Sequence, residues 1–442
     1  MGLGILGRGL GYTKFLAECG ADLIVTDLKT KKQLETSVRA LKKLKNITYR
    51  LGEHKLEDFK GRDMVIKAAG VPLDSIFIKE AQKNKIPVEM DVSLFAKLAP
   101  KVKIVGVTGT RGKSMVTALI YEILKQNEKW LGRNVYIGGN VRGVATLPLL
   151  KKVKVNDILV CELDSWQLQG FGDIKISPQI SVFTSFMPDH MNYYHNSMEK
   201  YFKDKANIFK YHKKNDILII RPGMKKFINR KKVKGKLAIV NAKDTEKLKF
   251  SVPGKFQQEN LACAIEVAKQ FNISVSKINQ ALKNFKGLEG RLQYVKTISK
   301  GVKIYNDNNA TTPEATIAGI QALSDVGRPF RTSNVRNDKR IILICGGADK
   351  KLPLDDFVKV LDKYCKAVIM IPGTGTDKLV SSARVLVYSK YVRDLKEAVK
   401  EAVKQSKKGD IILFSPAFAS FGQFNNEYER NDLFIKLVKK IR

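Results

Sequence analysis

The chain has 442 residues, 44% of them hydrophobic, and a formal net charge of +37 at pH 7. Its length predicts two to four domains. No apolar run reaches the roughly 18 residues that a membrane span needs. The first residues lack the pattern of a secretory signal, so we expect none. The five cysteines form no C-x-x-C pair, which excludes a zinc ribbon and a dithiol redox centre and indicates core thiols in the reducing cytoplasm; they are Cys19, Cys161, Cys263, Cys345 and Cys365.

The positive charge comes mostly from lysine, since the chain has 62 lysines and 18 arginines. Nucleic-acid surfaces favour arginine, which makes bidentate contacts to bases, with aromatic side chains nearby. Here the lysines are spread over every predicted helix, as is typical of solvated helix faces. We therefore predict no specific nucleic-acid partner, although the positive field would attract an anionic substrate. A P-loop ATPase that binds nucleic acid remains the alternative from another functional class.

Residues 1–97 alternate predicted strands with helices and open on a glycine-rich turn. Residues 2–7 read G-L-G-I-L-G, the spacing of a dinucleotide-binding turn, and a helix and a strand ending at Asp27 follow. An acid about 20 residues after the last glycine is where such folds hold a ribose hydroxyl. The turn should follow a strand, but only Met1 precedes it, so either this strand is missing or the start of the chain is clipped. A redox enzyme and a plain strand–turn–helix connection both remain open from these residues.

Residues 98–295 carry the most specific motif, a strand followed by a glycine-rich loop and an amphipathic helix at 103–124. Glycines let backbone N–H groups surround a phosphate at a helix N-terminus. The lysine of such a loop reaches the β- and γ-phosphates, and the hydroxyl after it ligates Mg²⁺. Val107 stands where the general Walker form has glycine, yet the order of elements still predicts binding of a nucleoside triphosphate. The loop residues are Gly109, Thr110, Arg111, Gly112, Lys113 and Ser114.

Two further polar groups follow predicted strands of this block. Glu162 and Asp164 end the segment D-I-L-V-C-E-L-D, and Asp189-His190 follows Q-I-S-V-F-T-S. Open α/β sheets bind ligands at the carboxyl ends of their strands, so Glu162 is well placed to hold Mg²⁺, with Asp164 as the second candidate and a plain surface acid as the alternative. For His190, a structural role and a metal or substrate contact both remain open.

Residues 296–442 contain five more short apolar segments, which we predict to be strands: 302–307, 340–347, 367–373, 383–388 and 410–416. Short strands alternating with helices in all three blocks predict an α/β fold with mainly parallel sheets covered on both faces. Segment 326–339 is polar and without periodicity, which predicts an exposed loop.

Motifs along nearly the whole chain resemble those of the Mur ligases. Those of the central block are G-V-T-G-T-R-G-K-S, I-G-G-N-V, C-E-L-D-S-W-Q-L and P-D-H-M-N-Y-Y-H. The more specific ones are similar to the D-glutamate-adding members: Y-N-D-N-N-A-T-T-P-E-A-T at 305–316, G-G-A-D-K at 346–350, S-P-A-F-A-S-F-G-Q-F at 415–424 and E-R-N at 429–431. The resemblance implies a Rossmann-like UDP-substrate domain at 1–97, a central P-loop ATPase domain at 98–295 and a Rossmann-like amino-acid-binding domain at 296–442.

The resemblance also implies site residues, and it makes the first glycine turn a UDP site rather than a nicotinamide site. The UDP-substrate residues would be Gly4, Gly7, Asp27, Lys29 and Asn140. The ATP residues would be the loop 109–114 with Gln257, Asn260, Arg291 and Asp307. The amino-acid pocket would contain Thr311, Lys350, Ser420 and Phe421. One or two Mg²⁺ ions would be held by Ser114, Glu162, His190 and a carbamylated Lys205, and the catalytic residues would be Lys113, His190 and Lys205.

The implied reaction is the ATP-dependent addition of D-glutamate to UDP-N-acetylmuramoyl-L-alanine through an acyl phosphate, in peptidoglycan precursor synthesis, by a cytoplasmic monomer. Another Mur-type or folylpolyglutamate-type amide ligase is the alternative. The sequence departs from the family pattern at four places. Asn308-Asn309 replaces the family's usual Ser-Lys, and Lys67-Ala68-Ala69-Gly70 replaces a Ser-Pro-Gly turn. Asp164 replaces a serine, and Glu427-Tyr428 replaces a pair whose first residue is aromatic.

Overall fold

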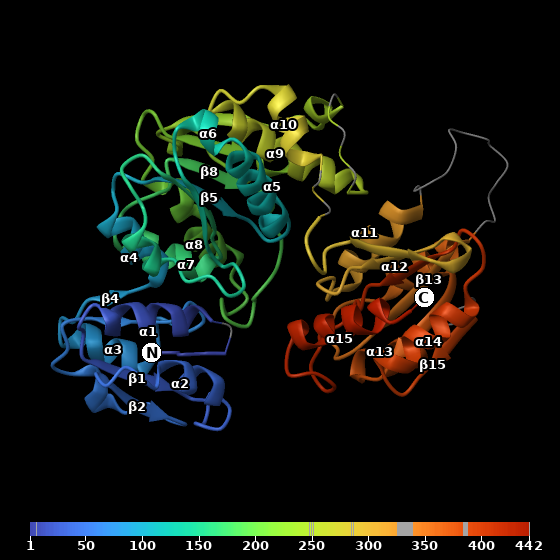
Figure 1. Ribbon diagram of the computed structural model, residues 1–442, viewed down its shortest axis with the longest axis horizontal. Helices are drawn as coiled ribbons and strands as arrows, with labels where there is room; N and C mark the ends of the chain where they lie inside the picture. Colours follow the sequence, from blue (N-terminus) through green and yellow to red (C-terminus); the bar gives the residue numbers. More distant parts are fainter. Residues whose placement is uncertain are drawn as a thin grey trace. The chain divides into compact units, whose positions relative to one another are not determined.

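The computed structural model describes residues 1–5, 7–246, 248, 250, 252–283, 285, 287–324, 339–382 and 388–441 (Figure 1). Most of the predicted loop 326–339 and of the predicted strand 383–388 lies outside these residues. The chain forms two compact units. The first comprises Met1–Lys249 and Glu259–Lys283, and the second comprises Phe250–Gln258 and Asn284–Arg442.

The N-terminal part of the first unit contains two parallel strand pairs, β1–β2 and β3–β4. Residues 1 and 2 connect the pairs, because Gly2 N donates to Thr26 O at 2.7 Å and the Met1 amine donates to Ile66 O at 2.9 Å. The elements are α1 (Arg8–Glu18), β1 (Leu23–Asp27), α2 (Glu35–Leu41), β2 (Ile47–Leu51), β3 (Val65–Ile66), α3 (Ile76–Lys83), β4 (Val88–Glu89) and α4 (Asp91–Leu98).

The rest of the first unit is built on a six-stranded, wholly parallel sheet of order β10-β9-β8-β5-β7-β6. One face packs on α4, α7 and α8 through a core that includes Phe95, Phe171 and Ile208, and α5 packs on β5, β6 and β7. Its elements are β5 (Lys103–Thr108), α5 (Lys113–Gln126), α6 (Glu128–Leu131), β6 (Val135–Gly139), β7 (Ile158–Glu162), α7 (Ser165–Asp173), β8 (Ile180–Phe183), α8 (Met198–Lys210), β9 (Ile217–Ile220), β10 (Lys236–Ile239), α9 (Lys255–Lys269) and α10 (Val275–Leu282).

A buried carboxylate joins the N-terminal part to this sheet. Asp91, the first residue of α4, accepts hydrogen bonds from Thr146 N at 2.9 Å and Leu147 N at 2.7 Å. These two bonds, together with the apolar contacts of α4 with α7, explain why residues of the first two predicted domains form one compact unit.

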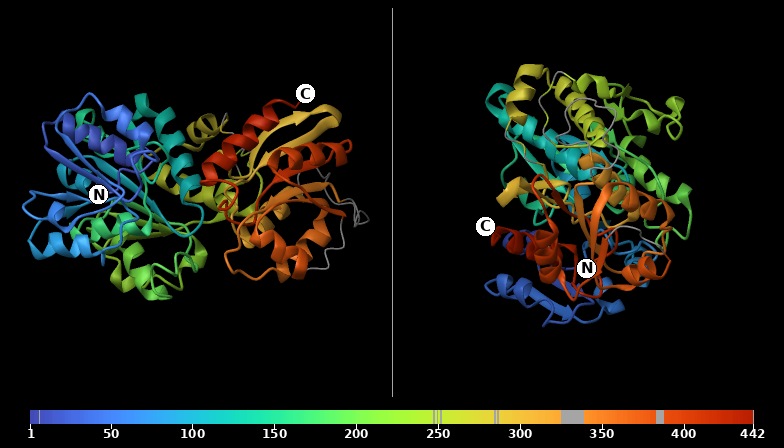
Figure 2. Two further views of the ribbon diagram at one scale, coloured as in Figure 1. Left: turned by 90° about the horizontal axis from the view of Figure 1, so that it is seen from below. Right: turned by 90° about the vertical axis from the view of Figure 1, so that its right-hand side faces the viewer.

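The second unit has a six-stranded sheet of order β11-β12-β16-β13-β14-β15, in which only the edge pair β11–β12 is antiparallel. Alternate residues of β13 point to opposite faces, so Leu343 packs with α11, α12 and α13 while Ile342 packs with α14 and α15. Figure 2 shows helices on both sides of this sheet. Its elements are β11 (Gln293–Ile298), β12 (Val302–Asn306), α11 (Pro313–Ser324), β13 (Ile341–Gly346), α12 (Asp355–Tyr364), β14 (Cys365–Ile371), α13 (Thr374–Ser382), β15 (Tyr388–Tyr391), α14 (Leu395–Gln405), β16 (Ile411–Phe414) and α15 (Glu427–Lys439).

The architecture confirms the predicted α/β class with mainly parallel sheets. The predicted boundary between residues 295 and 296 falls inside β11, whose pairing with β12 ties both halves of that strand to the second unit. Within the described part of the chain, no helix is both long and apolar enough to cross a membrane.

Candidate active site

The glycine-rich loop lies between β5 and α5, as the sequence predicts. Gly109 and Gly112 have positive φ angles of 144° and 90°, and Gly112 caps the N-terminus of α5. A side chain at Gly109 would collide with the Thr184 hydroxyl, since its Cβ would lie 2.1 Å from that oxygen. Thr110 N and Arg111 N donate to the backbone and side-chain oxygens of Ser185, both at 2.8 Å. The loop is therefore preformed, with a helix N-terminus available for an anion.

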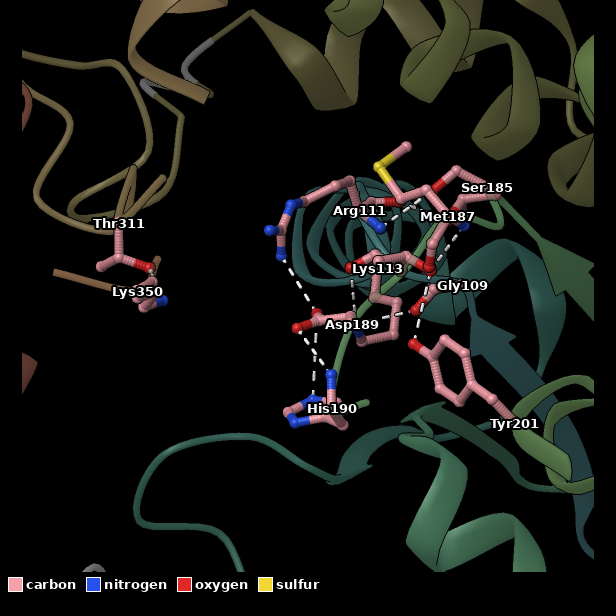
Figure 3. Close-up of polar contacts among 12 residues, drawn as sticks. Gly109, Arg111, Lys113, Ser185, Met187, Asp189, His190, Tyr201, Thr311 and Lys350 are labelled. Atoms are coloured by element: carbon pink, nitrogen blue, oxygen red, sulfur yellow. Dashed lines mark hydrogen bonds and ion pairs between the residues drawn. The ribbon is translucent and has the colours of Figure 1, made fainter. Parts of the chain in front are cut away.

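Two lysine ammonium groups contact this loop, and Figure 3 labels one of them, Lys113, beside Gly109. Lys113 Nζ donates to Gly109 O at 2.9 Å and to Thr110 O at 3.2 Å, and Lys205 Nζ donates to Gly109 O at 3.0 Å. Lys205 is only 1% exposed on α8. Burial, and then the Lys113 charge, hold the pKa of Lys205 well below its usual value. A buried amine with a depressed pKa can become neutral, and a neutral amine is the form that reacts with CO₂.

Glu162 lies beside the loop because its strand pairs with β5. It is the last residue of β7, opposite Val107 in the parallel register, and is 5% exposed. Its carbonyl accepts from Asn140 N at 2.7 Å, which places the predicted substrate residue Asn140 next to it. Asp164, the other candidate carboxylate, caps α7: its side chain accepts from Gln167 N at 2.7 Å in a capping box. This capping role explains an acid at a position where the family has serine, because both residue types are good N-caps.

His190 lies in the segment that follows β8, the third strand that ends at this site. Its backbone is left-handed, with φ 54°, and its ring packs on Trp166 with centroids 4.8 Å apart. Burial lowers the pKa of His190, and the charges of Lys113 and Lys205 act in the same direction, while Asp189 opposes them. The neighbouring Asp189 pairs with Arg111 of the loop at 3.3 Å. His190 can therefore present a neutral imidazole on the loop side of the site.

Sequence reasoning missed two side chains of this region. Trp166, on α7, packs against the His190 ring at an interplanar angle of 50°. It lies inside the motif C-E-L-D-S-W-Q-L, but its residue type alone indicated no contact with His190. Arg221 follows β9 and contacts the side chain of Asn260 on α9, a predicted ATP residue. A Cβ on Gly112 would lie 2.8 Å from an Arg221 nitrogen, so this guanidinium packs directly against the phosphate loop.

No group of three or more His, Cys, Asp or Glu side chains in the described part of the chain is arranged to hold a metal ion. Mg²⁺ commonly keeps several waters and takes one or two carboxylates plus substrate phosphates. Glu162 and Ser114, both next to the phosphate loop, fit that donor set. A carbamate on Lys205 would add one further oxygen ligand at the same place.

The N-terminal glycine turn is organised by Asp27. One carboxylate oxygen accepts from Gly4 N at 2.8 Å and the other from Lys29 N at 2.9 Å. Gly7 caps α1 with φ 90°. The tightest position is Gly9, which the predicted motif did not include: a Cβ there would lie 2.0 Å from Leu3 O. The structure thus brings four of the predicted UDP residues to one turn and uses the acid to shape that turn.

The second unit carries the other predicted ATP residues. Gln257 lies in its short segment 250–258. Asp307 directly follows β12 and accepts from Leu292 N and the Ser415 hydroxyl at 2.9 Å each. Burial raises the pKa of Asp307 to about 7, against the lowering effect of these two hydrogen bonds and of the Arg291 charge. Asp307 therefore connects the segment that carries Arg291 to the end of β16.

Three loops at the carboxyl ends of β12, β13 and β16 hold the predicted amino-acid residues. Lys350 Nζ donates to the Thr311 hydroxyl at 2.8 Å (Figure 3). Ala348 and Ala419 form an isolated antiparallel bridge, which places Ser420 beside the Lys350 loop. Phe421 is 66% exposed, so its ring is available to a ligand rather than packed in the core. A cation with two hydroxyls suits a carboxylate ligand.

Comparison with known proteins gives the same assignment along the whole chain. The family models for the Mur ligase middle domain and for the Mur ligase glutamate ligase domain match residues 107–236 and 290–418. A curated UDP-N-acetylmuramoylalanine--D-glutamate ligase of Borreliella burgdorferi (strain ATCC 35210 / DSM 4680 / CIP 102532 / B31) is 35% identical and covers 100% of this chain and 97% of its own length. The protein of the same name from Roseiflexus sp. (strain RS-1) is 32% identical, with 99% and 97% covered.

Solved structures agree at the level of the fold. The UDP-N-acetylmuramate-alanine ligase of Thermotoga maritima superposes with a TM-score of 0.62 at 17% identity, covering 99% of this chain and 98% of its own. The MurF ligase of Thermotoga maritima in complex with ADP gives a TM-score of 0.55 at 19% identity, covering 87% and 97%. From its motifs, its fold and relatives that are more than 30% identical over their full length, the chain belongs to the Mur ligase family.

Proposed function

We propose that the chain is an ATP-dependent ligase that joins D-glutamate to UDP-N-acetylmuramoyl-L-alanine in the cytoplasm. The observation that carries this proposal is the full-length similarity to curated ligases of that name, combined with a preformed phosphate loop. The pair Lys350–Thr311 supports an amino-acid substrate with a carboxylate that it can bind while the amine reacts. The ADP bound to the MurF ligase structure supports ATP as the nucleotide.

The residues suggest a division of labour in acyl-phosphate chemistry. The terminal phosphoryl group of ATP would be transferred to the substrate carboxylate, and the amine of glutamate would then displace the phosphate. Lys113 would neutralise charge on the transferred group, since phosphoryl transfer depends mainly on positioning and electrostatic stabilisation. Mg²⁺, held by Ser114 and Glu162, would supply further positive charge at the phosphates. His190, with its lowered pKa, would accept the proton that the attacking amine loses.

The test is a coupled phosphate-release assay on the purified full chain with ATP, MgCl₂, UDP-N-acetylmuramoyl-L-alanine and a panel of amino acids. We expect release with D-glutamate and a product of the corresponding mass, and little release with L-glutamate, L-lysine, diaminopimelate or D-alanyl-D-alanine. UDP-N-acetylmuramate without alanine and a folate substrate serve as acceptor controls. Release that depends on another amino acid, or on the folate substrate, would replace this proposal by the related amide ligase.

A further inference from the structure

The motif E-R-N at 429–431 has no role in the site as described so far, although its arginine is among the most buried side chains of the chain. Arg430 lies on α15 and is 0% exposed. Arginine is almost never fully buried without an ionic partner, yet no carboxylate lies within ion-pair distance of Arg430 among the residues that the structure describes. Its guanidinium instead donates to neutral oxygens of two loops.

The first loop is the one that leads to Thr311. Arg430 Nε donates to the side-chain oxygen of Asn308 at 2.8 Å, and Nη2 donates to the Asn308 carbonyl at 3.0 Å. Asn308 uses its amide group in the opposite direction, donating to Asn309 at 3.1 Å and to Glu427 O at 2.9 Å. Asn308 therefore fits an arginine on one side and the start of α15 on the other, which gives a reason for asparagine where the family commonly has serine.

The second loop is the one that leads to Ser420 and Phe421. Arg430 Nη1 donates to Phe418 O at 3.3 Å. The next residue, Ala419, bridges to Ala348, two positions before Lys350. Ala417, the residue before Phe418, has a left-handed backbone with φ 63°, and its N donates to Ala310 O at 2.9 Å. One buried guanidinium thus fixes the bases of two of the three loops that carry the proposed amino-acid residues.

We propose that Arg430 is a positioning residue for the acidic amino-acid substrate, which sets the spacing between the Thr311 loop and the Ser420 loop. This inference rests on the proposed glutamate ligase function. A buried cation without a carboxylate partner is costly to stability, so a residue with a purely structural task could be replaced by an apolar one. Burial lowers the pKa of Arg430 to about 10, against the charge of Glu427, which makes no ion pair with it, so Arg430 keeps its charge at neutral pH.

The experiment compares apparent KM values for D-glutamate, ATP and the UDP substrate in Arg430→Lys, Arg430→Met and Asn308→Ala. Arg430→Lys keeps the charge but cannot make the forked contacts. Asn308→Ala removes the side-chain acceptor of Arg430 Nε and the two bonds that the Asn308 amide donates, and it keeps the Asn308 carbonyl that accepts from Nη2. Lys436→Met is the matched control, because Lys436 is exposed on the same helix. Folding is checked by thermal unfolding and circular dichroism.

We expect the KM for D-glutamate to rise roughly 10- to 150-fold in Arg430→Lys, the range for lost hydrogen bonds to a charged group, and less in Asn308→Ala. The KM values for ATP and the UDP substrate should stay within about threefold, and Lys436→Met should match the wild type. If Arg430→Met does not fold, the two milder variants decide.

Folded Arg430→Lys and Asn308→Ala proteins with an unchanged KM for D-glutamate would overturn the inference, and so would a parallel rise in all three KM values. A wild-type protein without D-glutamate-dependent phosphate release would overturn the proposed function itself, and the positioning role with it. The two failures are therefore told apart by the wild-type measurement.

Discussion

Lys205 offers the sharpest test of the site, because its environment opposes an ammonium charge. Its Nζ and that of Lys113 both contact Gly109 O at about 3 Å, so the two nitrogens lie within about 6 Å of each other. At an effective dielectric constant of 20, two like charges at that distance repel by about 3 kcal/mol. A carbamate on Lys205 would turn this repulsion into an attraction of similar size and would supply an oxygen ligand for Mg²⁺.

The first readout is activity. Lys205→Ala should lose roughly 10²- to 10³-fold in kcat, the range for removing one preorganised electrostatic group, and short carboxylic acids such as acetate should restore part of the rate. Lys205→Arg should be inactive, since it keeps the charge but cannot be carbamylated. Mass spectrometry under mild conditions should detect a labile adduct of about 44 Da, the mass of CO₂, on the wild type. A fully active Arg variant would refute the reasoning.

The second readout is stability in CO₂-free buffer. Because the folded-state pKa of Lys205 is lowered, the folded chain binds fewer protons than the unfolded chain at pH values between the folded pKa and 10.5. The cost of burying the ammonium is complete below the folded pKa and disappears as pH rises to 10.5. Lys205→Met should therefore unfold with about 1–3 kcal/mol more free energy than the wild type at low pH. The difference should shrink on raising pH or on adding bicarbonate; a pH-independent difference would contradict this account.

Three further outcomes are expected. Lys113→Ala should abolish phosphate release while circular dichroism stays unchanged, because Lys113 supplies the point charge for the β- and γ-phosphates; near-normal release would rule that role out. Lys350→Ala should raise the KM for glutamate by roughly 10- to 150-fold and that for ATP much less, and an equal effect on both would place the amino acid elsewhere. DNA and RNA should bind weakly, without sequence preference, and dissociate as salt is raised; sub-micromolar, sequence-selective binding at physiological salt would show that the charge of +37 has a nucleic-acid partner.

The fold class was predictable because the buried strands of parallel sheets are continuous apolar runs with a strong local signal. Segments such as I-I-L-I-C-G and I-L-V-C-E are fully buried in β13 and β7. The strands β2 and β11 gave no such signal, since both are only partly buried and mix polar with apolar residues. Their assignment depends on pairing with β1 and β12, which is information that a local pattern does not contain.

The candidate site divides in the same way. The phosphate loop is a local motif, and Glu162 could be placed from its position at a strand end. Trp166 and Arg221 could not, because each acts through a contact made across the fold: Trp166 on His190, and Arg221 on Gly112 and Asn260. Arg430 contacts Asn308, 122 residues earlier in the sequence. Such contacts join residues that are far apart in the sequence, and they form only when the folded sheet brings the ends of its strands together. A local sequence pattern therefore does not predict them.

Asp164 has two candidate roles: the sequence allows it to bind Mg²⁺, and the structure shows it capping a helix. A pair of substitutions at Asp164 can separate these two roles. From the sequence, Glu162 is the expected Mg²⁺ ligand and Asp164 the second candidate; in the structure the Asp164 carboxylate caps α7. If capping is its main task, Asp164→Ser should keep most of the activity, because serine caps a helix about as well, whereas Asp164→Ala should lose about 1 kcal/mol of stability. Glu162→Gln should retain stability and lose Mg²⁺-dependent phosphate release.

The measurements are urea unfolding and the Mg²⁺ dependence of the rate. A stable Asp164→Ser protein that is as inactive as Glu162→Gln would show that Asp164 holds the metal, and that its place at the helix N-terminus is secondary.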